Sequence, residues 1–366
     1  MRILHVINDL RLAGAERLLA DLATQQRESG MDVSLAPLVA CGSAFETNIR
    51  DAGVPLLMPD RPHPIRSPSH IARFRRMIGG YDLVHVHLFP AQLWIALAAL
   101  TQGRSAPILF TTEHNTHNTR RNVRAFRLVD RLMYSKYDHI AAISEGTRDA
   151  MATYLPETAS KISVVHNGID PRRFTGSGSP EERACLFPQI PITAPLLLCI
   201  GRLEPQKDFP NLLWAFAQVP DAHLAVIGTG PLQAELEALA QTLAIPTRVH
   251  FFGRRNDIPA LLRNADVYVQ ASEWEGFGIA AVEAMASGLP LVITDVQGLR
   301  EVVADAGIRV PRGKPDALAD AIRKLLATPA QRQALSKRAR ERSQIFSIAA
   351  TADAYKELYE RSKKAT

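Results

Sequence analysis

The stretch ADVYVQASEWEGFGIAAVEAMASG, residues 265–288, contains a strand, a loop and a helix in the order that parallel α/β folds use. Its first part, 265–272, is rich in β-branched and aromatic residues, as buried strands are. Its last part is rich in alanine and ends at Gly288, which is typical of a short helix with a glycine cap. The loop 273–278 therefore follows the carboxyl end of a strand, where doubly wound sheets bind their ligands.

The same alternation of short apolar runs and amphipathic stretches recurs along all 366 residues, as in βαβ units. This length favours two domains. The Gly, Ser and Pro residues of 174–194 predict a linker, which separates a domain of residues 1–173 from one of 195–345. The expected strands are 3–7, 33–39, 82–88, 107–114, 139–144 and 162–168, then 196–203, 223–230, 248–253, 267–272 and 289–295. The predicted fold class is thus α/β, with two Rossmann-like doubly wound parallel sheets.

Composition excludes several classes of protein. No run approaches the ~18 apolar residues of a membrane span, and the apolar run at the start is too short for a signal peptide, so we expect a soluble cytoplasmic protein. Aromatic residues are only 6% and no recognition module occurs, which argues against nucleic acid. The cysteines lie far apart, so we expect neither disulfides nor thiolate metal sites, and we expect these side chains to be buried: Cys41, Cys185 and Cys199.

The net charge of +6 is concentrated in residues 118–137, where arginines recur every one to four residues among apolar ones. If this segment is a helix, it has a basic side and an apolar side. Such a helix suits an anionic membrane surface or an anionic lipid-linked substrate. The alternative is an ordinary surface helix with a solvated charged face.

Two glutamates flank the glycine-rich turn of the opening stretch, and no basic residue lies between Glu275 and Glu283. Glycines at a helix start let a ligand approach the backbone, and the free amides of residues 277–280 favour a phosphate. Glu283, among alanines, can accept two hydrogen bonds from a ribose diol. Both carboxylates are therefore expected to meet hydroxyls rather than basic partners, although Glu283 alone could be an ordinary helix glutamate.

Cationic and glycine residues follow other strands. Arg202 and Lys207 come directly after a buried strand and suit a diphosphate, although two cations in a loop are more often surface residues. Gly14 lies near a helix start and is another candidate for an anion. Neither this loop nor residues 227–233 contain Gly-x-Gly-x-x-Gly, so a dinucleotide site is not favoured.

Histidines gather near two strands of the first domain: His85 and His87 lie in one strand, and His114 and His117 follow another. A His-x-His strand with further histidines could bind a metal. Because no carboxylate completes the set, we expect no metal and interpret His114 as a hydrogen-bonding residue at a strand's carboxyl end.

Taken together, the motifs resemble those of the retaining glycosyltransferases of family 4, which have the GT-B fold. The resemblance rests on EGFGIAAVEAMASGLPLVITDVQGLREVV for the Glu-x7-Glu motif, GRLEPQKDF for Gly-Arg-x4-Lys, VVHNGID, and AGAERLLADLA for the glycine-rich loop. Two positions depart from the family, since Ala13 and Asp208 stand where glycine is frequent. The resemblance implies two domains facing across a cleft, with an acceptor domain of residues 1–173, a donor domain of 195–345 and a last helix, 346–366, that packs back on the first.

The resemblance also implies roles for individual residues. Glu283 would bind the nucleotide ribose and Glu275 the transferred hexose, while Arg202 and Lys207 would hold the diphosphate. The remaining donor-binding candidates are Gly14 from the first domain, Arg254 for the base, and the backbone of Gly276, Phe277, Gly278 and Ile279. The catalytic candidates are Glu275, His114, Arg202 and Lys207, with His114 near sugar and acceptor.

The reaction that the resemblance implies is transfer of a hexose from a nucleotide diphosphate sugar, with UDP or GDP, to an acceptor hydroxyl. It would proceed with retention, without metal or cofactor, in polysaccharide or glycolipid biosynthesis. A saccharide or lipid-linked acceptor is expected, with peripheral membrane contact through 118–137. Two alternatives stay open: a nucleotide-sugar 2-epimerase of the same fold, and a degenerate donor-binding protein that acts as an assembly partner.

Overall fold

The computed structural model describes residues 1–11, 14–103, 106–116 and 119–365. The chain divides into two units, each with its own sheet and core. The first unit comprises Met1–Gly168 and Ile348–Thr366, and the second comprises Ile169–Ser347.

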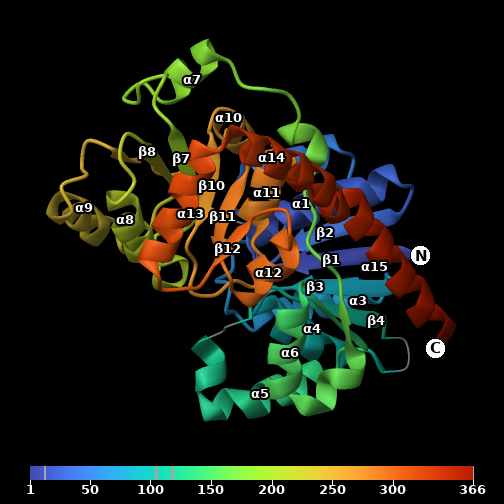
Figure 1. Ribbon diagram of the computed structural model, residues 1–366. Helices are drawn as coiled ribbons and strands as arrows, with labels where there is room; N and C mark the ends of the chain where they lie inside the picture. Colours follow the sequence, from blue (N-terminus) through green and yellow to red (C-terminus); the bar gives the residue numbers. More distant parts are fainter. Residues whose placement is uncertain (12–13, 104–105, 117–118, 366) are drawn as a thin grey trace. The chain divides into compact units, whose positions relative to one another are not determined.

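The first unit is built on a parallel six-stranded sheet with the order β2-β1-β3-β4-β5-β6. Figure 1 labels the first four of these strands. Both faces of this sheet are covered, which explains why its strands are nearly continuous apolar runs. Ile3 and Leu4, neighbours in β1, belong to different core clusters on opposite faces. The strands are β1 (Arg2–Ile7), β2 (Asp32–Pro37), β3 (Leu83–His87), β4 (Ile108–Glu113), β5 (His139–Ala142) and β6 (Ile162–Val164).

Helices of the first unit divide between the two faces of the sheet. α1, α2 and α15 contribute to one core cluster, and α3, α4, α5 and α6 to the other. The helices are α1 (Gly14–Glu28), α2 (Ala44–Asp51), α3 (Ser69–Ile78), α4 (Ala91–Ala99), α5 (Arg124–Tyr134), α6 (Glu145–Tyr154) and α15 (Ile348–Ala365), with short 3-10 helices η2 (Thr119–Asn122) and η3 (Pro156–Lys161).

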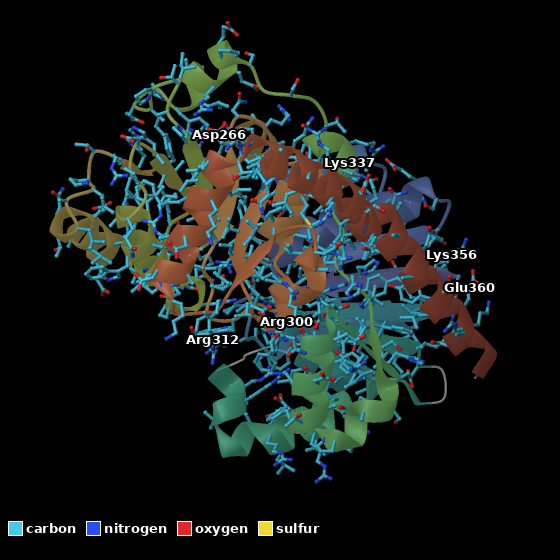
Figure 2. The ribbon with its side chains drawn as sticks, in the orientation of Figure 1. Asp266, Arg300, Arg312, Lys337, Lys356 and Glu360 are labelled. Carbon is cyan, nitrogen blue, oxygen red and sulfur yellow. The ribbon has the colours of Figure 1, made fainter. Side chains whose placement is uncertain are left out.

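The C-terminal helix α15 belongs to the first unit although it follows the second in the sequence. Tyr355 and Tyr359 are fully buried in the core between α15 and the first sheet. Lys356 and Glu360, one residue further on in each case, are exposed (Figure 2). This spacing of four residues places the apolar stripe of α15 on the sheet and its charged face in solvent.

The second unit has a parallel six-stranded sheet of its own, with the order β12-β11-β10-β7-β8-β9. The two parallel sheets confirm the predicted α/β class. β12 was not predicted, because its three residues place Arg309 between two apolar residues and form no continuous apolar run. The strands are β7 (Leu196–Ile200), β8 (His223–Ile227), β9 (Val249–Phe251), β10 (Val267–Gln270), β11 (Leu291–Thr294) and β12 (Ile308–Val310).

Helices α8, α9 and α13 bury their apolar stripes on one face of the second sheet. The helices of this unit are α7 (Pro180–Leu186), α8 (Phe209–Ala217), α9 (Gln233–Thr242), α10 (Ile258–Arg263), α11 (Ile279–Ala286), α12 (Gln297–Val303), α13 (Pro315–Ala327) and α14 (Pro329–Ser343), with 3-10 helices η4 (Pro171–Phe174), η5 (Pro205–Lys207) and η6 (Gln344–Phe346).

The boundary between the units lies at Gly168–Ile169, earlier than the linker expected at 174–194. Residues 174–194 include α7 and belong to the second unit. Phe187 is fully buried, and Arg183 binds Asp266 through Nη1 at 3.1 Å. The turn-forming residues of 174–194 correctly predicted an interruption of the strand pattern. They gave no indication of these contacts with distant residues of the second unit.

The expectation that all three cysteines are buried is wrong for two of them. Cys41 and Cys185 are exposed, whereas Cys199 is buried in β7. Among the described residues, no helix is both long and apolar enough to cross a membrane.

Candidate functional site

The second sheet reverses its strand order between β7 and β10. From β7 the chain proceeds to β8 and β9 on one side, and from β10 to β11 and β12 on the other. β7 and β10 are parallel neighbours, with Leu197 beside Val267, so both carboxyl ends lie at the same edge. Such a switch point is where doubly wound sheets bind ligands. The loops that follow these two strands carry Arg202, Lys207 and Glu275.

Glu275 is the most constrained side chain at this edge. It is buried, and its Oε1 accepts hydrogen bonds from Gln270 Nε2 at 2.6 Å and Ser272 Oγ at 2.8 Å. The same oxygen forms an ion pair with the ammonium group of Lys207. The expectation that Glu275 has no basic partner is therefore wrong. Lys207 is distant in the sequence, but the parallel pairing of β7 and β10 brings the two loops together.

Local backbone geometry places Lys207 against Glu275. A Cβ added at Gly201 would lie 3.1 Å from Cε of Lys207, so glycine gives the lysine side chain room beside β7. Asp208 follows with φ +44° and ψ +49°, a left-handed conformation that favours glycine. Its carboxylate accepts a hydrogen bond from the amide of Asn211 at 3.4 Å and caps α8. The N-cap offsets part of the backbone cost, which explains why aspartate is tolerated there.

The turn before α11 presents backbone rather than side chains. Gly278 caps the helix with φ +97°, a conformation that glycine adopts without strain. Phe277 is buried and packs edge-on against Phe346, with ring centroids 5.5 Å apart. The amides of Ala281 and Val282 donate to the carbonyl of Gly278, whereas those of Ile279 and Ala280 precede these bonds, so this end of α11 favours an anion.

Glu283 is half-buried on α11, one helical turn further from the loop. Burial raises the pKa of Tyr268 in β10 well above its usual range, and the charges near it, including those of Glu275 and Glu283, add to the rise. Glu275 thus contacts Gln270 at the end of β10, and the charge of Glu283 acts on Tyr268 of the same strand.

The predicted cations Arg202 and Arg254 lie at the surface. The Arg202 side chain is 77% exposed and pairs with Glu204 at 2.5 Å. Arg254 follows β9 and is exposed, while its neighbour Arg255 is engaged with Asp257. Among the residues predicted for the donor site, Lys207 and Glu275 are in direct contact.

Sequence reasoning missed Gln270 and Ser272, the two neutral donors to Glu275. Gln270 is 1% exposed and also accepts a hydrogen bond from the Tyr268 hydroxyl at 2.9 Å. A glutamine inside an otherwise apolar buried strand is the signal that could have found it, because buried polar groups need partners.

In the first unit, the strand order reverses between β1 and β3. Gly14 begins α1 after the loop that follows β1, and it is exposed. His114 follows β4 directly, next to β3, and is half-buried. These two predicted residues therefore follow the carboxyl ends of strands, whereas Ala13 and His117 lie outside the described residues.

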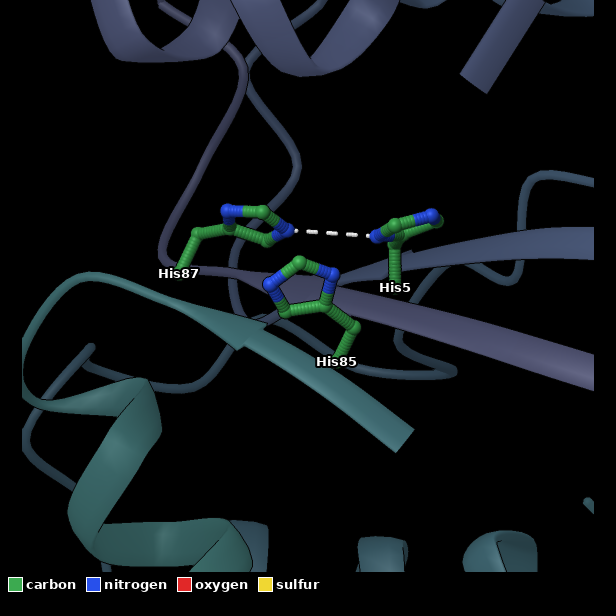
Figure 3. A group of neighbouring side chains, drawn as sticks. All are labelled: His5, His85 and His87. Carbon is green, nitrogen blue, oxygen red and sulfur yellow. Dashed lines mark hydrogen bonds between the residues drawn. The ribbon is translucent and has the colours of Figure 1, made fainter. Parts of the chain in front are cut away.

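A histidine cluster lies inside the first unit, and it includes His5, which sequence reasoning missed. His5, His85 and His87 are buried, with one nitrogen of each ring within 4.8 Å of the others (Figure 3). Burial lowers the pKa of His5 to about 4 and those of His85 and His87 well below the usual value. Burial also lowers the pKa of His114 to about 4, so these four imidazoles are neutral at pH 7.

The basic segment 118–137, whose first residue lies outside the described part, does not have the simple basic side that was expected. Arg120 binds Asp130 at 3.1 Å and Arg121 binds Glu113 at 3.1 Å, and each arginine side chain is only 9% exposed. These two arginines hold the start of the segment to the core. The outward surface of α5 and its approach carries the exposed arginines Arg127 and Arg131. It also carries exposed apolar side chains: Val123, Phe126, Leu128, Val129 and Leu132.

Two doubly wound parallel sheets in tandem are the architecture of the GT-B class of proteins. Residues 12–173 match the family described as Glycosyltransferase Family 4, and residues 187–342 match Glycosyl transferases group 1. A D-inositol 3-phosphate glycosyltransferase of Corynebacterium urealyticum is 30% identical over 321 residues, covering 79% of this chain and 74% of that protein. The chain belongs to the group 1 glycosyltransferases of family 4.

Two further comparisons define the extent of the likeness. An uncharacterized glycosyltransferase of Methanocaldococcus jannaschii is 31% identical over 197 residues, so the match spans 51% of this chain and 50% of that relative. The crystal structure of Anabaena HepE in complex with UDP and glucose has a TM-score of 0.85 at 23% identity, covering 98% of this chain and 99% of that one. This second likeness supports the GT-B fold.

Proposed function

We propose that the protein is a retaining hexosyltransferase that uses a nucleotide diphosphate sugar, and the observation that carries this proposal is the Lys207–Glu275 pair beside the start of α11. A diphosphate at this edge would meet the ammonium group of Lys207 and the first-turn amides of the helix. The sugar hydroxyls would meet the carboxylate of Glu275. The cation and the helix start thus match the diphosphate of the donor, and the carboxylate matches its sugar.

The reaction places growing negative charge on the leaving diphosphate. Lys207 and Arg202 stabilise that charge, together with backbone amides in the segment from Gly276 to Ile279 that contains Phe277 and Gly278. Glu283 accepts hydrogen bonds from the ribose, and Arg254 contacts the base. Lys207 has three donors, so it can bind a phosphate oxygen while it still neutralises Glu275. No metal is needed for this stabilisation, and transfer in the presence of a chelator tests that point.

Residues of the first unit complete the proposal. Gly14 offers the start of α1 to the donor phosphates, and His114 accepts a hydrogen bond from a hydroxyl of sugar or acceptor. UDP is favoured as the nucleotide because HepE, which has the same fold, was crystallised with UDP and glucose. The acceptor is a saccharide or lipid-linked saccharide.

The surface of α5 supports a lipid-linked acceptor at an anionic membrane. Leu128 and Leu132 are 63% and 61% exposed, and they lie on the same helix as Arg127 and Arg131. Apolar side chains can enter the interface while nearby arginines attract anionic headgroups. This arrangement favours peripheral membrane contact over a solvated charged face, and hence a location at the inner face of the cytoplasmic membrane.

Vesicle sedimentation tests the membrane proposal separately from catalysis. We expect the protein to sediment with phosphatidylglycerol vesicles at low salt, and less with phosphatidylcholine vesicles or at high salt. Leu128→Glu combined with Leu132→Glu should abolish sedimentation. The matched control is Leu100→Glu, which changes another exposed leucine. Equal sedimentation of the double variant and the wild type would exclude α5 as the contact surface.

A turnover assay with UDP-hexoses distinguishes the transferase from its two alternatives. A transferase releases UDP faster when lipid-linked saccharides are added, and the product keeps the anomeric configuration of the donor. A 2-epimerase changes the nucleotide sugar without any acceptor. A donor-binding assembly protein binds the nucleotide sugar but releases no UDP under either condition, and that result would contradict the proposed function.

A further inference from the structure

A chain of buried hydrogen bonds runs from α1 to His114, the candidate residue at the carboxyl end of β4. Gln26 Oε1 lies 2.8 Å from His5 Nε2, and His5 Nδ1 lies 3.2 Å from His87 Nε2. His87 Nδ1 then lies 3.3 Å from His114 Nε2. Gln26, His5 and His87 are each at most 2% exposed, so water does not interrupt the chain.

The sheet itself holds these rings in place. His5 of β1 lies beside His85 of β3 in the parallel register, and His87 follows two residues later on the same face (Figure 3). His85 belongs to a second arm, in which its Nδ1 lies 2.6 Å from the Tyr359 hydroxyl and its Nε2 lies 2.7 Å from Thr112 Oγ1. This second arm ties the cluster to α15.

The cluster is better suited to hydrogen bonds than to a metal ion. A metal would need a lone pair from each of three rings, but both nitrogens of His85 are already paired with hydroxyl groups. No aspartate or glutamate belongs to the group that the described residues form, so the charge of a divalent ion would be buried without compensation. Neutral imidazoles in a hydrogen-bonded chain carry no such cost.

The direction of every hydrogen bond in the chain follows from Gln26. An amide oxygen only accepts, so His5 must carry its proton on Nε2 and accept on Nδ1. A neutral His87 then donates from Nε2 and accepts on Nδ1, which requires His114 to donate from Nε2. The Gln26 amide nitrogen has no hydrogen-bond partner among the described residues, so the amide is held through its oxygen, which faces His5 Nε2.

We propose that Gln26 is a positioning residue that acts through His5 and His87 to fix His114 as the Nε2–H tautomer. The remaining nitrogen, His114 Nδ1, has no polar partner among the residues that the structure describes. It is then an acceptor that can receive a hydrogen bond from a hydroxyl but repels a carboxylate. The role for substrate rests on the proposed function, and it favours neutral hexose or acceptor hydroxyls over a uronic acid.

The tautomer can be measured without substrate by ¹H–¹⁵N correlation of the imidazole nitrogens, which separates protonated from unprotonated nitrogens. Signals are assigned with single His→Gln variants. In the wild type we expect His114 to be protonated on Nε2 and unprotonated on Nδ1. In Gln26→Met, which keeps the unbranched shape but removes the acceptor, we expect the opposite tautomer of His114 to become populated. Gln25→Leu, on the same helix but not in the chain, should leave the His114 signals unchanged.

Turnover provides the second readout. Gln26→Met should lower kcat roughly tenfold, the effect of one hydrogen bond, and leave the KM for the donor unchanged. A wild-type His114 protonated on Nδ1 would overturn the proposal, as would an unchanged tautomer in Gln26→Met or ring signals that change when a chelator is added. If Gln26→Met does not fold, the tautomer of His114 in the wild type still tests the proposal. A wild type without turnover but with the expected tautomer would instead contradict the proposed function alone.

Discussion

Replacing Lys207 by methionine removes the ammonium group that neutralises Glu275 and keeps an unbranched side chain beside Gly201. The Lys207 and Glu275 side chains are 18% and 6% exposed, so this pair lies between a surface pair and a fully buried one. Breaking a buried pair costs about 3–5 kcal/mol, and a surface pair contributes about 0–1 kcal/mol. Because Gln270 and Ser272 still donate to Glu275, we expect the free energy of unfolding of the second unit to fall by about 2 kcal/mol.

Urea unfolding followed by circular dichroism measures this change, and a double-mutant cycle with Glu275→Gln isolates a coupling energy of about 1–2 kcal/mol. Lys337→Met is the matched control, because Lys337 lies 3.9 Å from Glu341 at the surface of α14. Its effect should stay within about 0.5 kcal/mol. A coupling energy near zero for Lys207 and Glu275 would refute the reasoning, since it would mean that the pair does not form in solution.

Three further predictions concern the backbone and the histidines. Asp208→Gly should leave the free energy of unfolding within about 0.5 kcal/mol of the wild type, because relief of the left-handed conformation offsets the loss of the cap. Asp208→Ala should lower the free energy of unfolding by about 1 kcal/mol, because it loses the cap without that relief. Gly278→Ala should lower the free energy of unfolding by about 1–3 kcal/mol and weaken donor binding, because its Cβ would lie 2.6 Å from Leu299 Cδ2. The control is Gly313→Ala, which also has a positive φ, +62°, but lies in open space, so its free energy of unfolding should fall less. Burial lowers the pKa of His5 and His114 to about 4. Below pH 6.5 the unfolded state therefore binds more protons than the folded state. As the pH falls from 6.5 to 4, the free energy of unfolding should decrease by at most about 1.4 kcal/mol per pH unit for each histidine. Urea unfolding over that pH range checks this slope, and a slope that is unchanged in His5→Gln would contradict the contribution of His5.

Much of the fold could be predicted from the sequence because parallel strands buried on both faces leave continuous apolar runs. The strand, loop and helix of 265–288 occur at β10 and α11 where the pattern places them. The short strand β12 and the helix α7 within 174–194 could not be predicted, because their positions depend on packing rather than on periodicity.

The site was harder to predict where partners are distant in the sequence. The register of β1 and β3 brings His5 beside His85, and no local pattern indicates that contact. In the same way, the sequence predicts Arg120 and Arg121 as surface cations. The structure shows that they pair with the buried carboxylates of Asp130 and Glu113. Motif spacing identified Lys207 and Glu275 individually, whereas their ion pair required the adjacency of β7 and β10.

A thermal-shift titration with UDP-, GDP- and ADP-hexoses tests the central claim most directly. A ligand that binds only the native state stabilises it by about 2.7 kcal/mol at a hundredfold excess over Kd. We predict that one of these nucleotide sugars raises the melting temperature of the wild type, and that Lys207→Ala and Glu283→Ala, both folded, lose the shift. If no nucleotide sugar raises the melting temperature, or if both variants keep the full shift, the assignment of the donor site at β7, β10 and α11 is wrong.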